Sequence, residues 1–543
     1  MSLSVGLNRV YSTEDTPGVN EPRTIQAYAT PIAIVVALAV VCALGACTTT
    51  MDQALSSDEI TALPAPALQQ HLAEGALTAE RVSEVFLSRI EALDQAGPAV
   101  NAIIEVNPDA LEIARGLDRA FAEHGPIGPL HGMPVVLKAN IDTADSLATS
   151  AGSLALAEHH AAADAPLVAR LRAAGAVLLA KTNLSEWANF RASDSISGWS
   201  SLGGQTHNPY VLDRNPCGSS SGSAVAVAAR LAPLAVGTET DGSIVCPAAL
   251  NGVVGIKPTL GLVSQQGIIP IAASQDTAGP MARTVAGAAS LLTVLLDHAV
   301  DYTTDATDLS GLRLGVIRDY YGADKRPRVK AEYHRWLEML RNAGAELIDP
   351  IKVRTNEAIS NAEFEVMLYE FKAGLNEYLE SSGAAQTSLA DLIAYNDAHA
   401  ETVMPHFGQD VFLAAEAKNG LDDPAYKAAL AASGALVRTR LEALFATHRL
   451  DALIAPSNAP AWKTDRVHGD RSLLDSAMIA AVSGYPSITV PAGLILELPV
   501  AISFIGKPGE EQQLIDIATV FEQVRGEFPA PRFIPTLEPR ERQ

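Results

Sequence analysis

The sequence predicts an α/β fold in which helices cover both faces of a central sheet. Helix patterns alternate with short, fully apolar strand patterns along the chain, and no fixed-period repeat points to a solenoid. With 543 residues, 48% of them hydrophobic, the chain can bury a large core. Length alone allows one large domain or up to about four smaller ones.

The first predicted helix follows Thr78, a residue type that caps helix N-termini. Apolar residues recur after it at helical spacing and form one stripe on a charged segment. These residues are Val82, Val85, Phe86, Ile90 and Leu93.

Three later segments repeat the order of helix and then buried strand. Residues 166–174 form a helix pattern with proline at its start, Gly175 stops it, and residues 176–180 are an apolar strand pattern. The same order recurs at residues 329–342 and 345–348, and again at residues 436–447 and 452–455. A sheet covered on both faces follows from this repetition.

The N-terminus carries the pattern of a bacterial lipoprotein signal. Residues 31–46 are uncharged and mostly apolar, which is short for a membrane span and suits a secretory signal. They end at Cys47 in a segment that resembles a lipobox, whose cysteine is freed and acylated. We therefore expect a signal peptide over 1–46, a tether over 47–64, and an exported periplasmic or cell-envelope protein anchored through Cys47. A short uncleaved anchor is the alternative.

The charge balance argues against nucleic-acid partners. The chain has 62 acidic and 39 basic residues, a formal net charge of −23, so its average surface repels phosphate backbones. No metal is expected either, because the 12 histidines show no ligand spacing. The sequence does not define an oligomeric state.

Only Cys217 and Cys246 of the four cysteines lie outside the signal. A bridge between them is conceivable in an oxidising compartment, but their separation in space is not known from sequence. We expect two small buried thiols.

A lysine and two serine loops carry the strongest functional signal. Lys138 ends an apolar strand pattern, where burial would lower its pKa and allow the neutral amine to accept a proton. Ser219 and Ser243 lie in glycine-rich loops, whose backbone N–H groups can converge on one point, as an acyl-transfer oxyanion requires. The combination predicts a serine hydrolase with a lysine base.

Two other nucleophiles compete with Ser243. Ser220 is the centre of a Gly-x-Ser-x-Gly match, but Pro216 precedes it where a nucleophile elbow needs a strand. Cys217 precedes a glycine turn near a helix start that could lower its pKa, although no spacing suggests a histidine partner. We interpret Ser220 as a supporting hydroxyl.

The residues around these loops closely resemble the amidase signature family. The similarity runs through residues 128–138, the long block 215–259, and segments 451–456 and 484–486, and covers about residues 65–531. It implies a single large α/β/α sandwich with a mixed central sheet, with the amidase domain over 65–537. It implies no cofactor.

The resemblance places the family's Ser–cisSer–Lys triad on three residues of this chain. Ser243 would be the nucleophile, Ser219 the bridging serine after a cis peptide bond from Gly218, and Lys138 the base. A serine is activated when a base accepts its proton, and a second hydroxyl can relay that proton. The backbone N–H groups of four residues would hold the oxyanion. These residues are Thr240, Asp241, Gly242 and Ser243.

The substrate prediction rests on departures from the commonest family pattern. Asp241 and Val245 stand where most members have glycine and arginine, and Ala139 stands where most have aspartate. The pattern is similar to that of bacterial peptide amidases, so we expect a peptide C-terminal amide or a related small amide as substrate. Asp241 could repel anionic products or serve only as a turn residue.

Aromatic residues that could line a substrate pocket, or equally pack in the core, are Tyr369, Phe371, Trp462 and Tyr485. Two rival functions remain open at this point. One is an ester or aryl acylamide hydrolase of the same mechanism, and the other is an exported solute-binding lipoprotein.

Overall fold

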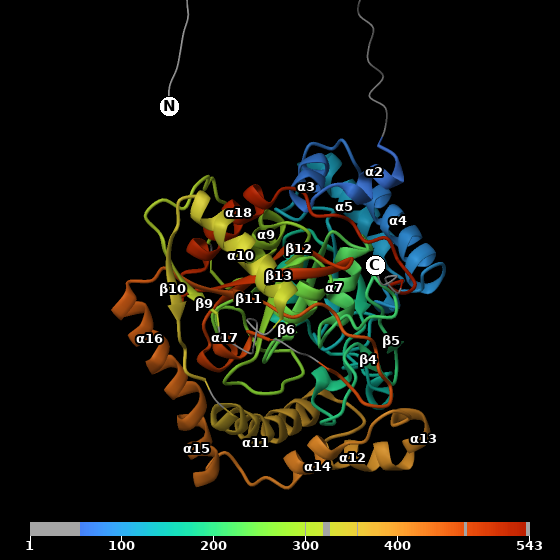
Figure 1. Cartoon of the computed structure of the whole chain (residues 1–543). Coiled ribbons are helices and arrows are strands. Elements are labelled where there is room, and N and C mark those ends of the chain that lie inside the picture. Colours follow the sequence, from blue (N-terminus) through green and yellow to red (C-terminus); the bar gives the residue numbers. More distant parts are fainter. Residues whose placement is uncertain (1–54, 299, 319–325, 356, 472–474, 539–543) are drawn as a thin grey trace, which may run out of the picture. The chain divides into compact units, whose positions relative to one another are not determined.

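The described residues form a central mixed sheet of eleven strands (Figure 1). The computed structural model describes residues 55–298, 300–318, 326–355, 357–471 and 475–538. The expected signal peptide and Cys47 lie outside these residues. In the part of the chain that is described, no helix has both the length and the apolar character to cross a membrane.

The sheet combines parallel and antiparallel pairs. β2 is parallel to both of its neighbours, β9 is parallel to β10 and β11, and the pairs from β6 across to β11 are antiparallel. Across the sheet the order is β1 (Ile103–Val106), β3 (Val177–Thr182), β2 (Pro134–Lys138), β6 (Leu234–Glu239), β8 (Thr277–Ala282), β7 (Val254–Lys257), β12 (Ser487–Ile495), β13 (Leu498–Ile505), β11 (Ala452–Pro456), β9 (Arg313–Ile317) and β10 (Glu346–Ile351). A second, two-stranded sheet pairs β4 (Trp199–Ser200) with β5 (Gly204–Gln205).

Helices cover both faces of the large sheet, as predicted. α7 (Ser221–Ala228) and α8 (Val245–Leu250) pack together, and α9 (Val285–Leu295) packs with α18 (Glu511–Arg525). In β8, the Met281 side chain lies next to Gly237 on the α7 side, whereas Ala282 lies next to Gly287 of α9. Because neighbouring strand residues point to opposite faces, α7 and α9 lie on opposite faces of the sheet.

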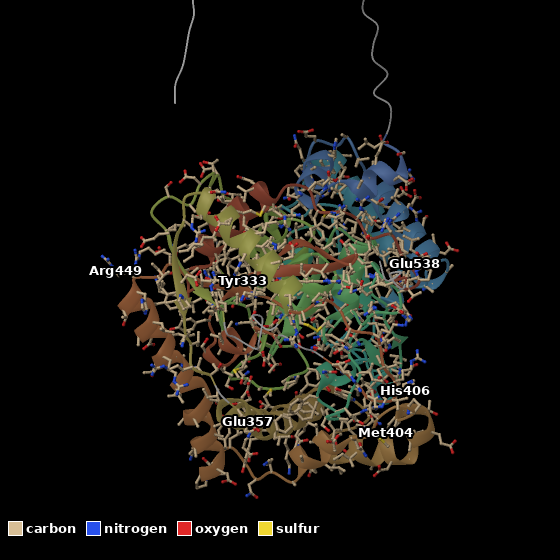
Figure 2. All side chains as sticks on the ribbon, viewed as in Figure 1. Tyr333, Glu357, Met404, His406, Arg449 and Glu538 are labelled. Atoms are coloured by element: carbon tan, nitrogen blue, oxygen red, sulfur yellow. A yellow bond between two sulfur atoms is a disulfide. The ribbon has the colours of Figure 1, made fainter. Side chains whose placement is uncertain are left out.

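α10 (Pro327–Asn342) joins α18 over β12. Its Tyr333, labelled in Figure 2, donates its hydroxyl to the backbone oxygen of Ile454 in β11 at 2.8 Å. This bond satisfies a buried phenol and ties the helix to β11, near the β10 edge of the sheet.

The remaining helices extend the two layers, and α11, α12 and α14 lie together at the lower edge of Figure 1. They are α2 (Ser57–Ala62), α3 (Ala65–Ala73), α4 (Ala79–Ile90), α5 (Ala110–His124), α6 (Pro166–Ala173), α11 (Glu357–Ser382), α12 (Leu389–Ala398), α13 (Ala400–Val403), α14 (Asp410–Glu416), α15 (Pro424–Leu430), α16 (Leu436–His448) and α17 (Met478–Ser483). Short 3₁₀ or π segments are η1 (Glu91–Gln95), η2 (Leu154–Leu156), η3 (Glu186–Asn189) and η5 (Ala431–Ala435).

The predicted helix–strand pairs are confirmed. α6 precedes β3, α10 precedes β10, and α16 leads to β11, each within a few residues of the predicted bounds. The Thr78 hydroxyl accepts the N–H of Arg81 at 3.1 Å and caps α4 as expected. Leu93, predicted in the same helix, lies in η1, because the chain widens to a π-helical turn after Ile90.

The expected tether differs from the structure at its end. Residues 57–62 form α2, capped by reciprocal hydrogen bonds between Ser56 and Glu59. Ile60 of this helix is fully buried, and α2 packs on α4. The folded unit therefore starts at Ser56.

Candidate active site

Lys138 lies at the C-terminal end of β2, the third strand from the β1 edge of the sheet, and is fully buried. Its Nζ atom lies 2.7 Å from Ser219 Oγ, 2.8 Å from Thr238 Oγ1 and 3.1 Å from Thr238 O. Burial lowers the pKa of Lys138 to about 7, and the negative charges of Asp276 and Glu239 oppose this shift. A large part of the Lys138 population is therefore neutral near pH 7.

Ser219 lies in the loop before α7, and the predicted cis peptide bond between Gly218 and Ser219 is present. Gly218 has no room for a side chain, because a Cβ atom there would lie 2.0 Å from Ser185 Oγ. Ser219 O accepts the N–H of Ser185 at 3.1 Å. These contacts hold the loop against the segment after β3 and aim Ser219 at Lys138.

Ser220 joins the same loop to β6. Its hydroxyl donates to Thr238 O at 3.0 Å and accepts the N–H of Thr238 at 3.2 Å, and the side chain is fully buried. Both hydrogen-bonding functions of this hydroxyl are thus in use, as expected for a supporting residue.

Ser243 lies in the loop between β6 and α8 and is 7% exposed. Its backbone oxygen accepts the N–H of Ser220 at 3.2 Å, so the two serine loops touch. In the described segments, no hydrogen bond joins the Ser219 and Ser243 hydroxyls. Likewise, among the described residues, the N–H groups of Asp241 and Ser243 have no acceptor, and both remain free to bind an oxyanion.

Glu239 organises the Ser243 loop, a role that the sequence analysis missed. The Glu239 side chain is 2% exposed, and its Oε2 accepts the N–H groups of Ile244 at 2.6 Å and Val245 at 2.9 Å. Burial lowers the pKa of fully buried Lys257 to about 8, and the charge of Glu239 opposes this shift. A glutamate and a lysine inside apolar strand patterns were the signal that could have found this pair.

Asp241 lies in a group of carboxyls beside the Ser243 loop. Burial raises the pKa of Asp241, and Glu363 and Asp475 raise it further. Glu363 accepts a hydrogen bond from Gln275 at 2.9 Å. Such close carboxyls share protons. Within the described residues no group of three or more His, Cys, Asp or Glu could hold a metal ion.

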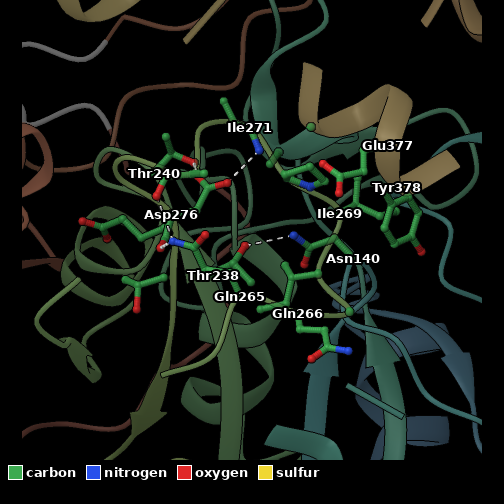
Figure 3. A pocket seen from close by; sticks show the side chains of 18 of the residues that line it. Asn140, Thr238, Thr240, Gln265, Gln266, Ile269, Ile271, Asp276, Glu377 and Tyr378 are labelled. Carbon is green, nitrogen blue, oxygen red and sulfur yellow. Dashed lines mark hydrogen bonds between the residues drawn. The ribbon is translucent and has the colours of Figure 1, made fainter. Parts of the chain in front are cut away.

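A cavity of about 400 Å³ adjoins the Lys138 side of the site (Figure 3). Its wall includes Thr238 and Asn140, which hydrogen-bond to each other at 3.0 Å. Asp276 accepts the hydroxyl of Thr240 in the same wall, and Tyr378 of α11 faces it from the other side. The cavity therefore reaches the hydrogen-bond partners of the buried lysine.

The four candidate pocket aromatics do not converge. Phe371, Trp462 and Tyr485 pack in three different hydrophobic clusters, and Tyr369 donates its hydroxyl to Asp423 at 2.9 Å. None of the four lines the cavity in Figure 3. Aromatic rings bury large apolar areas, and at these positions packing accounts for them.

The expectation of two free thiols is wrong, because Cys217 and Cys246 form a disulfide, with Cα atoms 6.0 Å apart. The two serine loops bring these residues together, a proximity that spacing in sequence does not reveal. A bridged sulfur is no thiolate, so the alternative of Cys217 as the nucleophile is also removed.

Comparison with known proteins agrees with this geometry. A family model described as "Amidase" matches residues 81–515. The native peptide amidase of Stenotrophomonas maltophilia is 47% identical, with a TM-score of 0.82 over 87% of this chain and 99% of that chain. An amidase family protein of Bacillus anthracis is 35% identical, with a TM-score of 0.80 over 88% of this chain and 93% of that chain. A protein named probable amidase from Arabidopsis thaliana is 39% identical over 85% of this chain and 90% of its own length.

Proposed function

The chain belongs to the amidase signature family and is an amidase, and from this premise we propose that it hydrolyses the C-terminal amide of peptides through a Ser243 acyl-enzyme. The contact between Lys138 and Ser219 carries this mechanism, since it joins a buried lysine to a hydroxyl at 2.7 Å. The substrate class is supported by the peptide amidase that is 47% identical to this chain. The alternative of a lipoprotein that only binds a solute does not agree with membership of this family.

Neutral Lys138 acts as the terminal base in this proposal. Its two N–H bonds can point at Thr238 Oγ1 and Thr238 O, which leaves the nitrogen lone pair to accept the hydrogen of Ser219 Oγ. Ser219 Oγ in turn accepts the proton of Ser243. Hydrogen bonds of this kind are often long without substrate and shorten when it binds.

Ser243 Oγ then attacks the amide carbonyl, and the backbone N–H groups of Asp241 and Ser243 bind the resulting oxyanion. Thr240 and Gly242 complete the predicted set of four donors. The relay returns the proton to the nitrogen of the leaving group, the C–N bond breaks, and ammonia leaves. Water, deprotonated along the same path, attacks the acyl-enzyme and releases the peptide acid.

Turnover of a substrate panel, followed by release of the peptide acid that all its members have in common, tests the proposed function. The panel compares a dipeptide amide with the matched ester and anilide, and the control variant is Ser290→Ala, a serine of α9 on the opposite face of the sheet from α7. We expect the dipeptide amide to have the highest kcat/KM. Faster turnover of the ester or the anilide would instead support the ester or aryl acylamide alternative.

We also propose that the protein is exported and held at the cell envelope through Cys47. The apolar segment 31–46 supports this, and so does the disulfide, because stable bridges form mainly in oxidising compartments. Mass spectrometry of the mature N-terminus tests the proposal. We expect an acylated Cys47, and an intact segment 31–46 would contradict it.

A further inference from the structure

A second cavity, of about 390 Å³, lies at the opposite end of α7 from the serine loops. α7 starts at Ser221 and spans about 12 Å, and Arg230 lies two residues beyond its last residue, Ala228. Arg283 and Arg525 line the same cavity from the ends of β8 and α18. In a chain of net charge −23, three arginines in one pocket concentrate positive charge that most of the surface lacks.

Arg525 has hydrogen-bond donors without acceptors. Its side chain is 7% exposed, and its Nε and Nη1 have no partner among the described residues. Its Nη2 lies 3.5 Å from Glu522 Oε1, and its guanidinium lies 5.3 Å from the centre of the Phe528 ring. Buried donors without partners cost free energy, so the unpaired edge of this guanidinium is suited to an anionic ligand.

Arg230 and Arg283 line the same pocket as Arg525, and Arg283 is repelled by Arg230 and Arg89. Arg283 donates from Nη1 to Ala62 O at 3.0 Å and also to Leu63 O. Burial lowers the pKa of Arg283 to about 10, and the charges of Arg230 and Arg89 lower it further. An anion between these groups would relieve their mutual repulsion.

Two carboxylates, Glu522 and Glu527, line the pocket together with the arginines. Glu522 accepts the N–H of Val285 at the start of α9 at 3.1 Å and is close to Arg525. Burial raises the pKa of Glu522 to about 7, so it is partly protonated near neutral pH. The negative charge of Asp58 raises the pKa of Arg89, against the effect of burial. Three lining arginines thus face two carboxylates, one of which is partly protonated, and the remaining positive charge suits an anionic ligand.

We propose that this pocket binds a phosphate group, carried by a soluble phosphate compound or by an anionic phospholipid. Arginine presents rigid pairs of N–H donors that match phosphate oxygens. The pocket is larger than phosphate alone, and Phe528, Pro529 and Ala530 supply apolar walls for an organic portion of the ligand. Ala62 and Pro64, which follow the expected lipid anchor in the sequence, complete the wall.

Calorimetry of the full chain with inorganic phosphate, at constant ionic strength in chloride, tests the soluble source. We expect saturable binding that Arg525→Gln and Arg230→Gln each weaken at least tenfold, because each removes charged donors. Arg341→Gln on α10 is the charge-matched control and should not change the Kd, since this arginine is exposed and its ion pair among the described residues is with Glu338. All three variants should still hydrolyse the amide, and this activity shows that they are folded.

Vesicle sedimentation with phosphatidylglycerol or phosphatidylcholine tests the lipid source. Binding to phosphatidylglycerol that the two pocket variants weaken, and the control does not, identifies a phospholipid headgroup as the ligand. If Arg525→Gln does not fold, Arg230→Gln carries the test, because among the described residues its side chain makes no hydrogen bond. Unchanged binding of both inorganic phosphate and vesicles in the pocket variants, or no saturable binding of either, overturns the proposal.

Discussion

Lys138 Nζ and Ser219 Oγ lie 2.7 Å apart in the interior of the protein, where neither side chain is exposed. If Lys138 is the terminal base, Lys138→Ala should lower kcat by about 10²- to 10⁴-fold, the usual contribution of general base catalysis. Lys138→Ala should change KM much less, which steady-state kinetics on a dipeptide amide would measure. A kcat near that of the wild type would remove Lys138 from the mechanism.

The pH profile should report the state of the same amine. Below about pH 7 the lysine is protonated and cannot accept a proton, so kcat/KM should fall about tenfold per pH unit there and level off above it. Asp276 raises the pKa of Lys138, so Asp276→Asn should move the inflection to lower pH. An inflection that stays in place in this variant would contradict the assignment.

The nucleophile assignment predicts a difference between two neighbouring serines. Ser243→Ala should abolish formation of an acyl-enzyme, observed by mass spectrometry after mixing with a slowly hydrolysed ester, because no other hydroxyl occupies that position. Ser220→Ala removes two hydrogen bonds to Thr238 and should mainly lower stability, by about 1 to 3 kcal/mol. An acyl group found on any other residue would disprove the role of Ser243.

Glu239 should act on catalysis through the loop that it holds. Glu239→Ala removes the acceptor for the N–H groups of Ile244 and Val245 and leaves Lys257 without its carboxylate. We expect kcat to fall more than tenfold with little change in KM, since the oxyanion donors would lose their fixed position. Glu239→Gln keeps an acceptor oxygen and should recover part of kcat. Equal kcat in the wild type and Glu239→Ala would exclude this positioning role.

The disulfide predicts a response to reductant. The bridge closes a loop of 29 residues, which constrains the unfolded chain and should stabilise the fold by about 3.5 kcal/mol. Reduction, or the double variant Cys217→Ser and Cys246→Ser, should therefore lower the urea midpoint. The double variant should be insensitive to reductant, and a reductant effect that persists in it would point to another cause.

Lys138 and the two serine loops could be singled out because residue type and glycine spacing are local properties of the sequence, while their catalytic role stays a prediction. Lys138 ends a strand pattern and glycines surround Ser219 and Ser243. The structure places Lys138 at the end of β2, Ser243 just after the neighbouring β6, and Ser219 just before α7. The helix–strand pairs were predictable for the same reason, since the period of the apolar residues is a local property.

What was missed depends on distant contacts. The bridge between Cys217 and Cys246 forms only when segments far apart in the chain meet. The same is true of the cluster of carboxyl groups from Asp241, Glu363 and Asp475. The substrate-pocket aromatics failed to converge because a ring in a substrate pocket and a ring in a core have the same local pattern. α2 was assigned to the tether because residues 48–66 are rich in Thr, Ser, Ala and Pro, a composition that suits a linker.

β6, the nearer of the two catalytic strands, is separated from β10 at the far edge of the sheet by six other strands (β8, β7, β12, β13, β11 and β9). That edge is therefore a suitable place to graft a peptide tag or to attach the enzyme to a solid support. An attachment there leaves the catalytic loops at a distance of many strand spacings, each about 4.8 Å. Enzyme immobilised through this edge should consequently keep its turnover, and the attachment to a fixed surface should make the enzyme more stable.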